Sequence, residues 1–206
     1  MIKITNEDNM ALMSRYPDNH FELAIVDPPY GININVSMGR RKGYKKSKYH
    51  KFAGEDCEIP NKEYFAELMR VSKNQIVWGG NYMTDFLYPS SCWLMWDKGF
   101  SEEVTFAQFE MAWTSFTSSA KKYDFNAAAN RNRIHPTQKP AKLYEWLLMN
   151  YAKEGDKILD THLGSGSIAL ACHNLKYDLT ACELDTEYYT ASLKRLKQHQ
   201  SQTTLF

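Results

Sequence analysis

Residues 157–172 read KILDTHLGSGSIALAC, and they predict a strand, a glycine-containing loop and a helix in direct succession. Residues 157–159 form a short apolar run of strand type, while the stretch from Ser167 to Leu175 is apolar enough to be a helix packed on a sheet. Glycines in such a loop let a ligand approach the backbone, and the start of the helix presents free amide groups. The segment therefore predicts an α/β fold with a ligand site at this turn.

The alternation of strand and helix extends outward from this segment to both ends of the chain. Further strand-like runs lie at residues 22–26, 75–78, 92–96 and 179–182. Apolar residues at helical spacing predict three more helices. The first follows the cap residue Asn61, the second has Pro140 at a first-turn position, and the third follows Thr186 as its cap.

This order of elements is typical of an α/β fold with one doubly wound, mostly parallel sheet. Residues 106–113 follow the strand at 92–96 without a helical spacer, so we expect an antiparallel hairpin at one edge of the sheet.

Length and composition predict one globular domain over residues 1–198, followed by a flexible tail over 199–206. The chain has 206 residues, of which 43% are hydrophobic and 24% charged, and its 25 basic and 24 acidic residues nearly cancel. The first residues lack the basic and apolar stretches of a signal peptide, and no apolar run is long enough to span a bilayer. We therefore expect a cytoplasmic protein without a membrane partner.

Cysteine and histidine spacing gives no sign of a metal site. The four cysteines show no paired spacing, which favours reduced, mostly buried thiols over a disulfide framework or a zinc site. Five histidines likewise lack paired ligand spacing and are interpreted as structural or solvated, namely His20, His50, His162, His173 and His199. We expect no bound metal.

The tetrapeptide Asp27-Pro28-Pro29-Tyr30 follows an apolar strand, where open α/β sheets bind their ligands. The prolines remove two amide donors and fix the carbonyl of Pro28 beside the Asp27 carboxylate and the ring of Tyr30. Two acceptors next to a flat ring suit a planar amino group and would offset the positive charge that grows on its nitrogen during alkylation. The alternative is an ordinary proline turn.

The glycine loop at residues 160–167 predicts a site for an adenosine-containing cofactor. Glu183 ends the next predicted strand, where its carboxylate could accept both hydroxyls of a ribose. Gly164, Gly166 and Ala169 also satisfy the dinucleotide fingerprint, so an oxidoreductase remains an alternative. Against it, Asp160 and three further residues separate the strand from the first glycine, which leaves a carboxylate free to meet a ligand ammonium group.

Together these two segments resemble the amino-methyltransferases of DNA, which use S-adenosylmethionine to methylate adenine at N6 or cytosine at N4. His135-Pro136-Thr137-Gln138-Lys139-Pro140 and Asn6-Glu7-Asp8-Asn9 are similar to further segments of that family. The Asp-Pro-Pro-Tyr motif precedes the glycine loop, as in the permuted beta group of phage and bacterial enzymes. The resemblance implies a Rossmann-like, permuted methyltransferase fold and double-stranded DNA as the substrate.

Carried over to this sequence, the resemblance implies two sets of site residues. The catalytic set, which would bind and stack a flipped base, is Asp27, Pro28, Pro29 and Tyr30. The set that would bind S-adenosylmethionine is Asp8, Asn9, Asp27, His135, Thr137, Lys139, Asp160, Thr161, Gly164, Ser165, Gly166, Ser167, Glu183 and Leu184.

The preferred reaction is adenine N6 methylation, because Asp rather than Ser stands before Pro-Pro-Tyr. Cytosine N4 methylation is the nearest alternative. Many family members have Pro-Phe where this chain has Thr161-His162, so a catalytically silent DNA-binding or regulatory module is the alternative from a different class.

A basic, aromatic loop at residues 31–54 is the expected DNA contact. It begins directly after Tyr30, contains no acid between Gly31 and Gly54, and interleaves tyrosines with cations. A solvated loop without a partner is the alternative. The expected phosphate contacts are Arg40, Arg41, Lys42, Lys45, Lys46, Lys48 and Lys51.

Two further regions carry expectations about sequence recognition and protein partners. Residues 114–132 should form a short recognition excursion, and a second subunit of a homodimer could also contribute to recognition. The end of the chain resembles the peptide by which bacterial replication proteins dock on the sliding clamp, with Gln202, Leu205 and Phe206 as anchors; a frayed terminus is the alternative.

Overall fold

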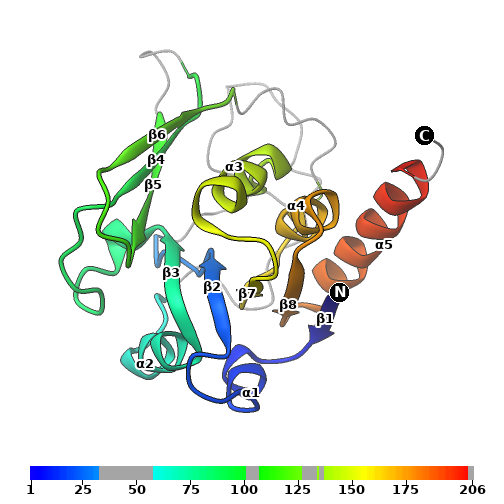
Figure 1. The fold of residues 1–206 in the computed structure, drawn as a ribbon, viewed down its shortest axis with the longest axis horizontal. Coiled ribbons are helices and arrows are strands. Elements are labelled where there is room, and N and C mark those ends of the chain that lie inside the picture. Colours follow the sequence, from blue (N-terminus) through cyan, green and yellow to red (C-terminus); the bar gives the residue numbers. More distant parts are fainter. Residues whose placement is uncertain (33–57, 101–106, 127–133, 135–136, 204–206) are drawn as a thin grey trace.

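A single eight-stranded sheet forms the centre of the protein in the computed structural model, which describes residues 1–32, 58–100, 107–126, 134 and 137–203 (Figure 1). The strands are β1 (Ile2–Asn6), β2 (Phe21–Val26), β3 (Ser72–Trp78), β4 (Leu94–Asp97), β5 (Phe109–Thr114), β6 (Lys121–Asp124), β7 (Lys157–Asp160) and β8 (Asp178–Glu183). The helices are α1 (Asn9–Met13), α2 (Lys62–Val71), α3 (Ala141–Tyr151), α4 (Ser167–Leu175) and α5 (Thr186–Thr203), with a 3-10 turn, η1, at Gly80–Tyr82.

The strand order is β1-β8-β7-β2-β3-β5-β4-β6. The five neighbouring strands β1, β8, β7, β2 and β3 are parallel to one another. By contrast, β5 pairs antiparallel with both β3 and β4. The predicted α/β fold with a mostly parallel sheet and an antiparallel hairpin is therefore confirmed. Because β2, β7 and β8 are parallel neighbours, Asp27, Asp160 and Glu183 come to the same edge of the sheet.

The hairpin of β4 and β5 is not the outermost part of the sheet. Residues 121–124, inside the expected recognition excursion at 114–132, form β6 and pair parallel with β4. Only Tyr123 in this strand is apolar, and it stacks on Trp146 at a ring distance of 5.1 Å. A strand this short and charged is typical of a protected sheet edge, and its sequence lacks the apolar alternation that predicts strands.

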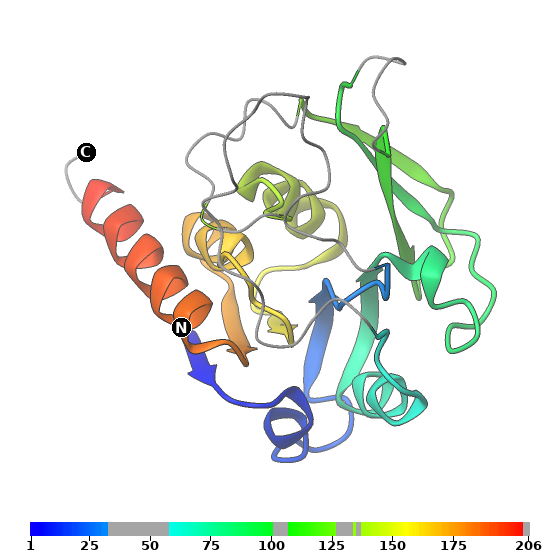
Figure 2. The same cartoon turned by 180° about the vertical axis from the view of Figure 1, so that it is seen from behind.

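Helices cover both faces of the sheet because successive side chains of each strand point to opposite sides. Leu23 and Ile25 of β2 join the core that includes α3 and α4, while Ala24 and Val26 join the core with α1 and α2. Figures 1 and 2 show α1 and α2 side by side, away from α3 and α4. The described cysteines, Cys92, Cys172 and Cys182, are free and buried.

The helix boundaries follow local capping chemistry. The predicted cap of α2 is confirmed, since Asn61 Oδ1 accepts a hydrogen bond from the Tyr64 amide at 3.0 Å. The prediction that Thr186 caps α5 is wrong: Asp185 Oδ1 accepts from the amides of Glu187 and Tyr188, and Thr186 is the first helical residue. The helix continues to Thr203, into the expected tail, because no glycine or proline interrupts residues 186–203.

Candidate active site

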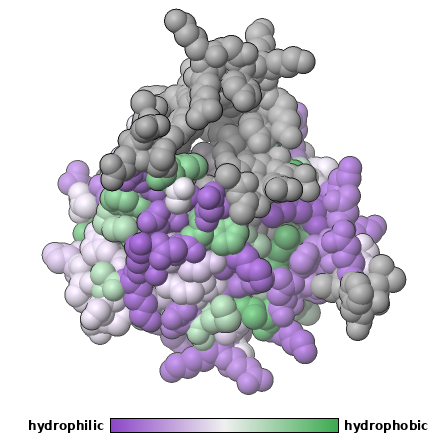
Figure 3. All heavy atoms as spheres, turned by 90° about the horizontal axis from the view of Figure 1, so that it is seen from above, coloured by the Kyte–Doolittle hydropathy of each residue, from purple (hydrophilic) through white to green (hydrophobic). Residues whose placement is uncertain are grey.

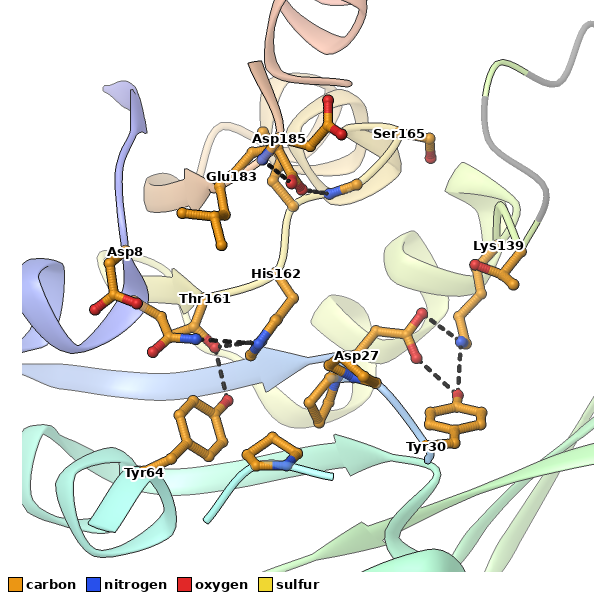
Figure 4. A pocket seen from close by; sticks show the side chains of 18 of the residues that line it. Asp8, Asp27, Tyr30, Tyr64, Lys139, Thr161, His162, Ser165, Glu183 and Asp185 are labelled. Atoms are coloured by element: carbon orange, nitrogen blue, oxygen red, sulfur yellow. Dashed lines mark hydrogen bonds and ion pairs between the residues drawn. The ribbon is translucent and has the colours of Figure 1, made fainter. Parts of the chain in front are cut away.

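One cavity of about 510 Å³ lies where β2, β7 and β8 end, and it brings both predicted motifs together (Figure 4). Its lining includes most of the predicted site residues, namely Asp8, Asn9, Asp27, Pro28, Pro29, Tyr30, Thr137, Lys139, Thr161, Gly164, Ser165, Glu183 and Leu184. Asp160, Gly166 and Ser167 lie close to it in the chain but do not line it. His135 lies outside the described residues.

Asp27 sits at one end of the cavity with both carboxylate oxygens engaged. Its Oδ1 accepts a hydrogen bond from the Tyr30 hydroxyl at 2.7 Å, and its Oδ2 accepts one from Lys139 Nζ at 2.5 Å. Lys139 Nζ also donates to the Tyr30 hydroxyl at 3.0 Å. Figure 4 shows these three side chains gathered into one cluster, which we call the acceptor cluster.

The ring of Tyr30 is held in place by a glycine. Gly79 follows β3 with a φ of +69°, and a Cβ there would lie 2.2 Å from Tyr30 Cε1. Tyr82, an exposed residue of η1, stacks on Tyr30 with the ring centroids 5.4 Å apart and the planes 21° from parallel. The backbone at Gly79 and the ring of Tyr82 therefore fix the orientation of Tyr30.

A second, partly buried carboxylate, Glu110 of β5, completes the acceptor cluster. Glu110 Oε2 lies 3.0 Å from Lys139 Nζ, and Oε1 lies 2.7 Å from Lys98 Nζ. Two acids and two lysines thus balance their charges. The Lys139 side chain is only 2% exposed, so its charge depends on these partners.

Burial and ion pairing act against each other in this cluster. Burial raises the pKa of Asp27, and the ammonium group of Lys139 opposes that rise. Burial would lower the pKa of Lys139, but the carboxylates of Asp27 and Glu110 outweigh it and raise that pKa. Burial would also raise the pKa of Glu110, yet Lys139 and Lys98 bring it down to about 2.

The other end of the cavity is built from the glycine loop and the end of β8. Glu183 Oε2 accepts a hydrogen bond from the Gly164 amide at 2.7 Å, and Oε1 accepts one from the Asp185 amide at 2.9 Å. Gly164 and Gly166 have φ values of +52° and +72°. At Gly166 a Cβ would come within 3.1 Å of Ser192, so the loop needs glycine for both conformation and space.

Asp160 lies beneath this loop and is almost completely buried. Its Oδ1 accepts a hydrogen bond from the His162 amide at 2.9 Å. Burial raises the pKa of Asp160 to about 8, and the charges of Asp27 and Glu183 add to the rise. A cationic group placed near Asp160 would therefore ionise it and be stabilised in return.

His162, interpreted from the sequence as structural or solvated, lines the cavity and joins three elements. Its Nε2 lies 3.1 Å from Asn9 Nδ2, and its Nδ1 lies 2.9 Å from Thr161 Oγ1. Thr161 Oγ1 is in turn 2.7 Å from the Tyr64 hydroxyl. Burial lowers the pKa of His162 to about 4, so the ring is neutral and can accept from Asn9 while donating to Thr161.

Arg195 of α5 ties the glycine loop to the segment that carries Lys139. Its Nη1 donates to the Ser165 carbonyl at 2.8 Å and to Ser167 Oγ at 2.9 Å. Ser167 Oγ donates to the Lys139 carbonyl at 2.6 Å. The two ends of the cavity are thus joined through polar contacts as well as through the sheet.

Sequence reasoning missed Glu110, Tyr64 and His162 as site residues. Glu110 is the one acid within the otherwise apolar run Phe109–Trp113, and an acid in such a strand is a signal for a buried partner. Tyr64 is one of the apolar residues at helical spacing behind Asn61, a pattern that predicts core packing. Nothing in the local sequence indicates that its hydroxyl reaches the cavity.

The expected DNA-contacting residues and the clamp-docking anchors Leu205 and Phe206 lie outside the described residues, while Gln202 is in the last turn of α5. On the face shown in Figure 3, hydrophilic and hydrophobic side chains intermingle among the described residues. No helix in the described ranges is long and apolar enough to cross a membrane. Within those same ranges, no group of His, Cys, Asp and Glu side chains is arranged to hold a metal ion.

Comparison with known proteins gives a consistent result. A family model described as DNA methylase, of the N6/N4 type, matches residues 44–194. The chain is 25% identical over 223 residues to the type II methyltransferase M.HpaI of Haemophilus parainfluenzae, an alignment that covers 87% of this chain and 69% of that protein.

Solved structures share the fold at low sequence identity. The M1.HpyAVI–SAM complex matches with a TM-score of 0.64 and 18% identity, covering 95% of this chain and 99% of that one. The cytosine-N4-specific PvuII DNA methyltransferase matches with a TM-score of 0.63 and 12% identity, covering 97% and 90%.

Proposed function

This chain belongs to the N6/N4 DNA methylase family, and we propose that it methylates the N6 amino group of a flipped adenine in duplex DNA. As a member it is a DNA amino-methyltransferase. The shared fold with the M1.HpyAVI–SAM complex supports S-adenosylmethionine as the proposed methyl donor. The observation that carries the proposal is the shared cavity in which Asp27 faces the glycine loop and Glu183. A DNA substrate is consistent with a cytoplasmic location in a bacterial cell, which we propose as well.

The residues at the glycine-loop end fit S-adenosylmethionine, which supplies a methyl group carried on a sulfonium when bound. The proposed ribose acceptor is Glu183, whose carboxylate already accepts two amide hydrogen bonds at the cavity wall. Gly164, which has a φ of +52°, lines this wall without a side chain. Asp160 would provide negative charge for the cofactor's ammonium group.

In the acceptor cluster, we assign Asp27 the role of accepting a hydrogen bond from the target amino group. Its carboxylate would offset the positive charge that develops on the nitrogen as the new bond forms. Tyr30 would stack on the base. Because Asp27 is largely buried at the cavity wall, a base within a stacked duplex could not reach it, so the proposal requires flipping.

The choice of adenine over cytosine rests on Asp27 standing before Pro-Pro-Tyr. Both bases present an exocyclic amino group, so the geometry of Asp27 suits either. Mass spectrometry of nucleosides from DNA treated with the protein distinguishes N6-methyladenine from N4-methylcytosine. Detection of the cytosine product would replace the adenine assignment while retaining the site.

The activity is tested with unmodified genomic DNA and isotopically labelled S-adenosylmethionine, followed by single-molecule sequencing of the product. The proposal predicts label in the DNA and modified adenines within one short sequence. Cofactor binding in calorimetry without any transfer to DNA would instead support a catalytically silent DNA-binding module.

The remaining expectations about partners stay predictions. Clamp docking predicts that purified sliding clamp is captured by the full chain and not by a chain that lacks Leu205 and Phe206. Equal capture by the two chains would end that idea. The homodimer prediction is tested by sedimentation of the protein with and without duplex DNA.

A further inference from the structure

The ammonium group of Lys139 lies in the acceptor cluster, directly beside the Asp27 carboxylate that is proposed to bind the target amine. Nζ lies within hydrogen-bond distance of Asp27 Oδ2, the Tyr30 hydroxyl and Glu110 Oε2. These three oxygens use all three of its hydrogens in the base-free protein. The group is therefore fully satisfied, and Lys139 lines the cavity although its side chain is only 2% exposed.

Several contacts fix the position of Lys139 independently. Glu110 holds Nζ from the side of β5, and Lys98 holds the other oxygen of Glu110. The rings of Trp78 and Tyr30 lie 5.2 and 5.5 Å from Nζ. At the backbone, the Lys139 carbonyl accepts from Ser167 Oγ. A flexible side chain held at both ends in this way is preorganised to act at one point.

We propose that Lys139 donates a hydrogen bond to the ring nitrogen beside the target amino group, while Asp27 accepts one from that amino group. Glu110 and Lys98 are positioning residues that act through Lys139. This inference rests on the proposed function and deepens it, because it names the group that recognises the base. It gives Lys139 a role at the base in place of the cofactor contact expected from the family resemblance.

The pairing of Asp27 and Lys139 matches the edge of an amino-base. Adenine presents its N6 hydrogens beside the acceptor N1, and cytosine presents its N4 hydrogens beside the acceptor N3. Enzymes that flip a base read this Watson–Crick edge by hydrogen bonds. With Oδ2 and Nζ 2.5 Å apart, an acceptor and a donor stand side by side, as such an edge requires.

A bound base must replace one present partner of Lys139, and the Tyr30 hydroxyl is the one most easily released. It is a neutral acceptor 3.0 Å away, whereas Asp27 and Glu110 are charged and bind the ammonium more strongly. Tyr30 keeps its hydrogen bond to Asp27 Oδ1 after this exchange. The two carboxylates then continue to aim Nζ while its third hydrogen turns to the base.

The test replaces the ring nitrogen of the target base by carbon and, separately, removes the charge of Lys139. The methylated position is first mapped with the wild-type protein. Duplexes are then made with adenine or 1-deazaadenine at that position, which deletes N1 and keeps the amino group; 3-deazacytosine serves if the mapped base is cytosine. The kcat/KM ratio for the two bases is measured for the wild type, Lys139→Met, Glu110→Gln and the control Lys142→Met.

The wild type should favour the natural base by between about 10-fold and 100-fold, the range for a hydrogen bond to a charged group. Lys139→Met should be slower on the natural base and should distinguish the two bases by less than about 3-fold, and Glu110→Gln should fall between these limits. Lys142→Met replaces a neighbouring lysine whose side chain is 69% exposed, and it should have the same kcat/KM ratio as the wild type. The kcat/KM ratio of the two bases is compared because a general loss of activity lowers both values and leaves their ratio unchanged.

Equal rates of the wild type on both bases would overturn the inference without any variant. Full discrimination by Lys139→Met would assign the effect to another residue and overturn it as well, and full discrimination by Glu110→Gln would remove the positioning role. These outcomes all require a mapped methylated base. Failure to find one in the first step would refute the proposed function itself, so the two failures are distinct.

Discussion

At the scale of single residues, the site depends on keeping Asp27 ionised in a place where burial favours its neutral form. A protonated carboxyl would donate a hydrogen bond from one oxygen and oppose an incoming N–H group. Burial raises the pKa of Asp27, and Lys139, at 2.5 Å, is the neighbour that counteracts it. The acceptor role of Asp27 is therefore inseparable from the lysine beside it.

Replacement of Asp27 tests the acceptor role directly. Asp27→Ala should reduce methyl transfer by at least about 100-fold, the usual loss when an electrostatic partner of a developing charge is removed. Asp27→Asn, which keeps an acceptor oxygen but not the charge, should retain more activity. Cofactor affinity, measured by calorimetry, should change little in either variant. Full turnover by Asp27→Ala would refute the assignment.

The glycine beneath Tyr30 gives a second prediction. Gly79→Ala should lower kcat by at least about 10-fold, because the new Cβ would overlap the ring of Tyr30 and displace it. Gly155→Ala is the matched control: its φ of +86° carries the same backbone strain, but nothing lies within 4 Å of the added atom. Gly155→Ala should lose about 1–2 kcal/mol of stability in thermal unfolding from backbone strain alone, and Gly79→Ala should lose more because of the overlap with Tyr30. Equal activities of the two variants would contradict this role for Gly79.

Asp160 makes cofactor binding depend on pH. Its pKa of about 8 means that it is mostly protonated at neutral pH, and a bound ammonium group would favour the ionised form. Binding should therefore release a proton, and the affinity for S-adenosylmethionine should rise as the pH increases from about 6 to 7.5.

Calorimetry in buffers of different ionisation enthalpy measures this proton release, and Asp160→Asn should abolish it. The His162 ring, with a pKa of about 4, stays neutral throughout that pH range and cannot imitate the effect. Proton release that persists in the variant would assign the titration to another group.

At the scale of elements, the sequence predicts most of the fold because local signals coincide with tertiary structure. The helix expected from Ser167 to Leu175 has those bounds in the structure, since a glycine loop begins it and the apolar run specifies it. Asn61 likewise marks the start of α2. The strand β6 escapes prediction because it is held by pairing with β4 and by the contact of Tyr123 with Trp146, rather than by its own pattern.

The contact between α5 and the glycine loop gives a prediction at this scale. Arg195→Gln should weaken S-adenosylmethionine binding by about 5-fold to 10-fold, because the loop loses charged hydrogen bonds to Ser165 and Ser167. Lys194→Gln, an exposed cation in the preceding position, is the control and should bind normally. If calorimetry gives the two variants the same affinity for S-adenosylmethionine, the contact of Arg195 does not shape the loop.

At the scale of the whole molecule, the parallel sheet joins motifs that are far apart in the chain. The ends of β2, β7 and β8 can be placed at one edge from the sequence, because parallel strands of one sheet share an edge. The acceptor cluster cannot be derived in the same way. Lys139 and Asp27 are 112 positions apart, and Glu110 enters from an antiparallel strand, so their meeting depends on the packing of three separate elements.

The basic stretch at residues 31–54 gives a prediction about DNA binding. Replacing Arg40, Arg41 and Lys42 by alanine should weaken duplex binding and reduce the slope of log K against log salt by up to about 3, one for each phosphate that the protein no longer neutralises. Cofactor affinity serves as the control and should not change. A salt slope equal to that of the wild type would place the DNA-binding surface elsewhere.

In the proposed reaction, the methyl donor and the target base meet in the cavity between Asp27 and the glycine loop. A crystal structure of the protein with S-adenosylmethionine and a duplex carrying the mapped target tests it most directly. We expect a flipped base on Asp27 whose amino nitrogen lies about 3 to 3.5 Å from the methyl carbon. A cofactor bound outside this cavity, or a base held away from Asp27, would contradict it.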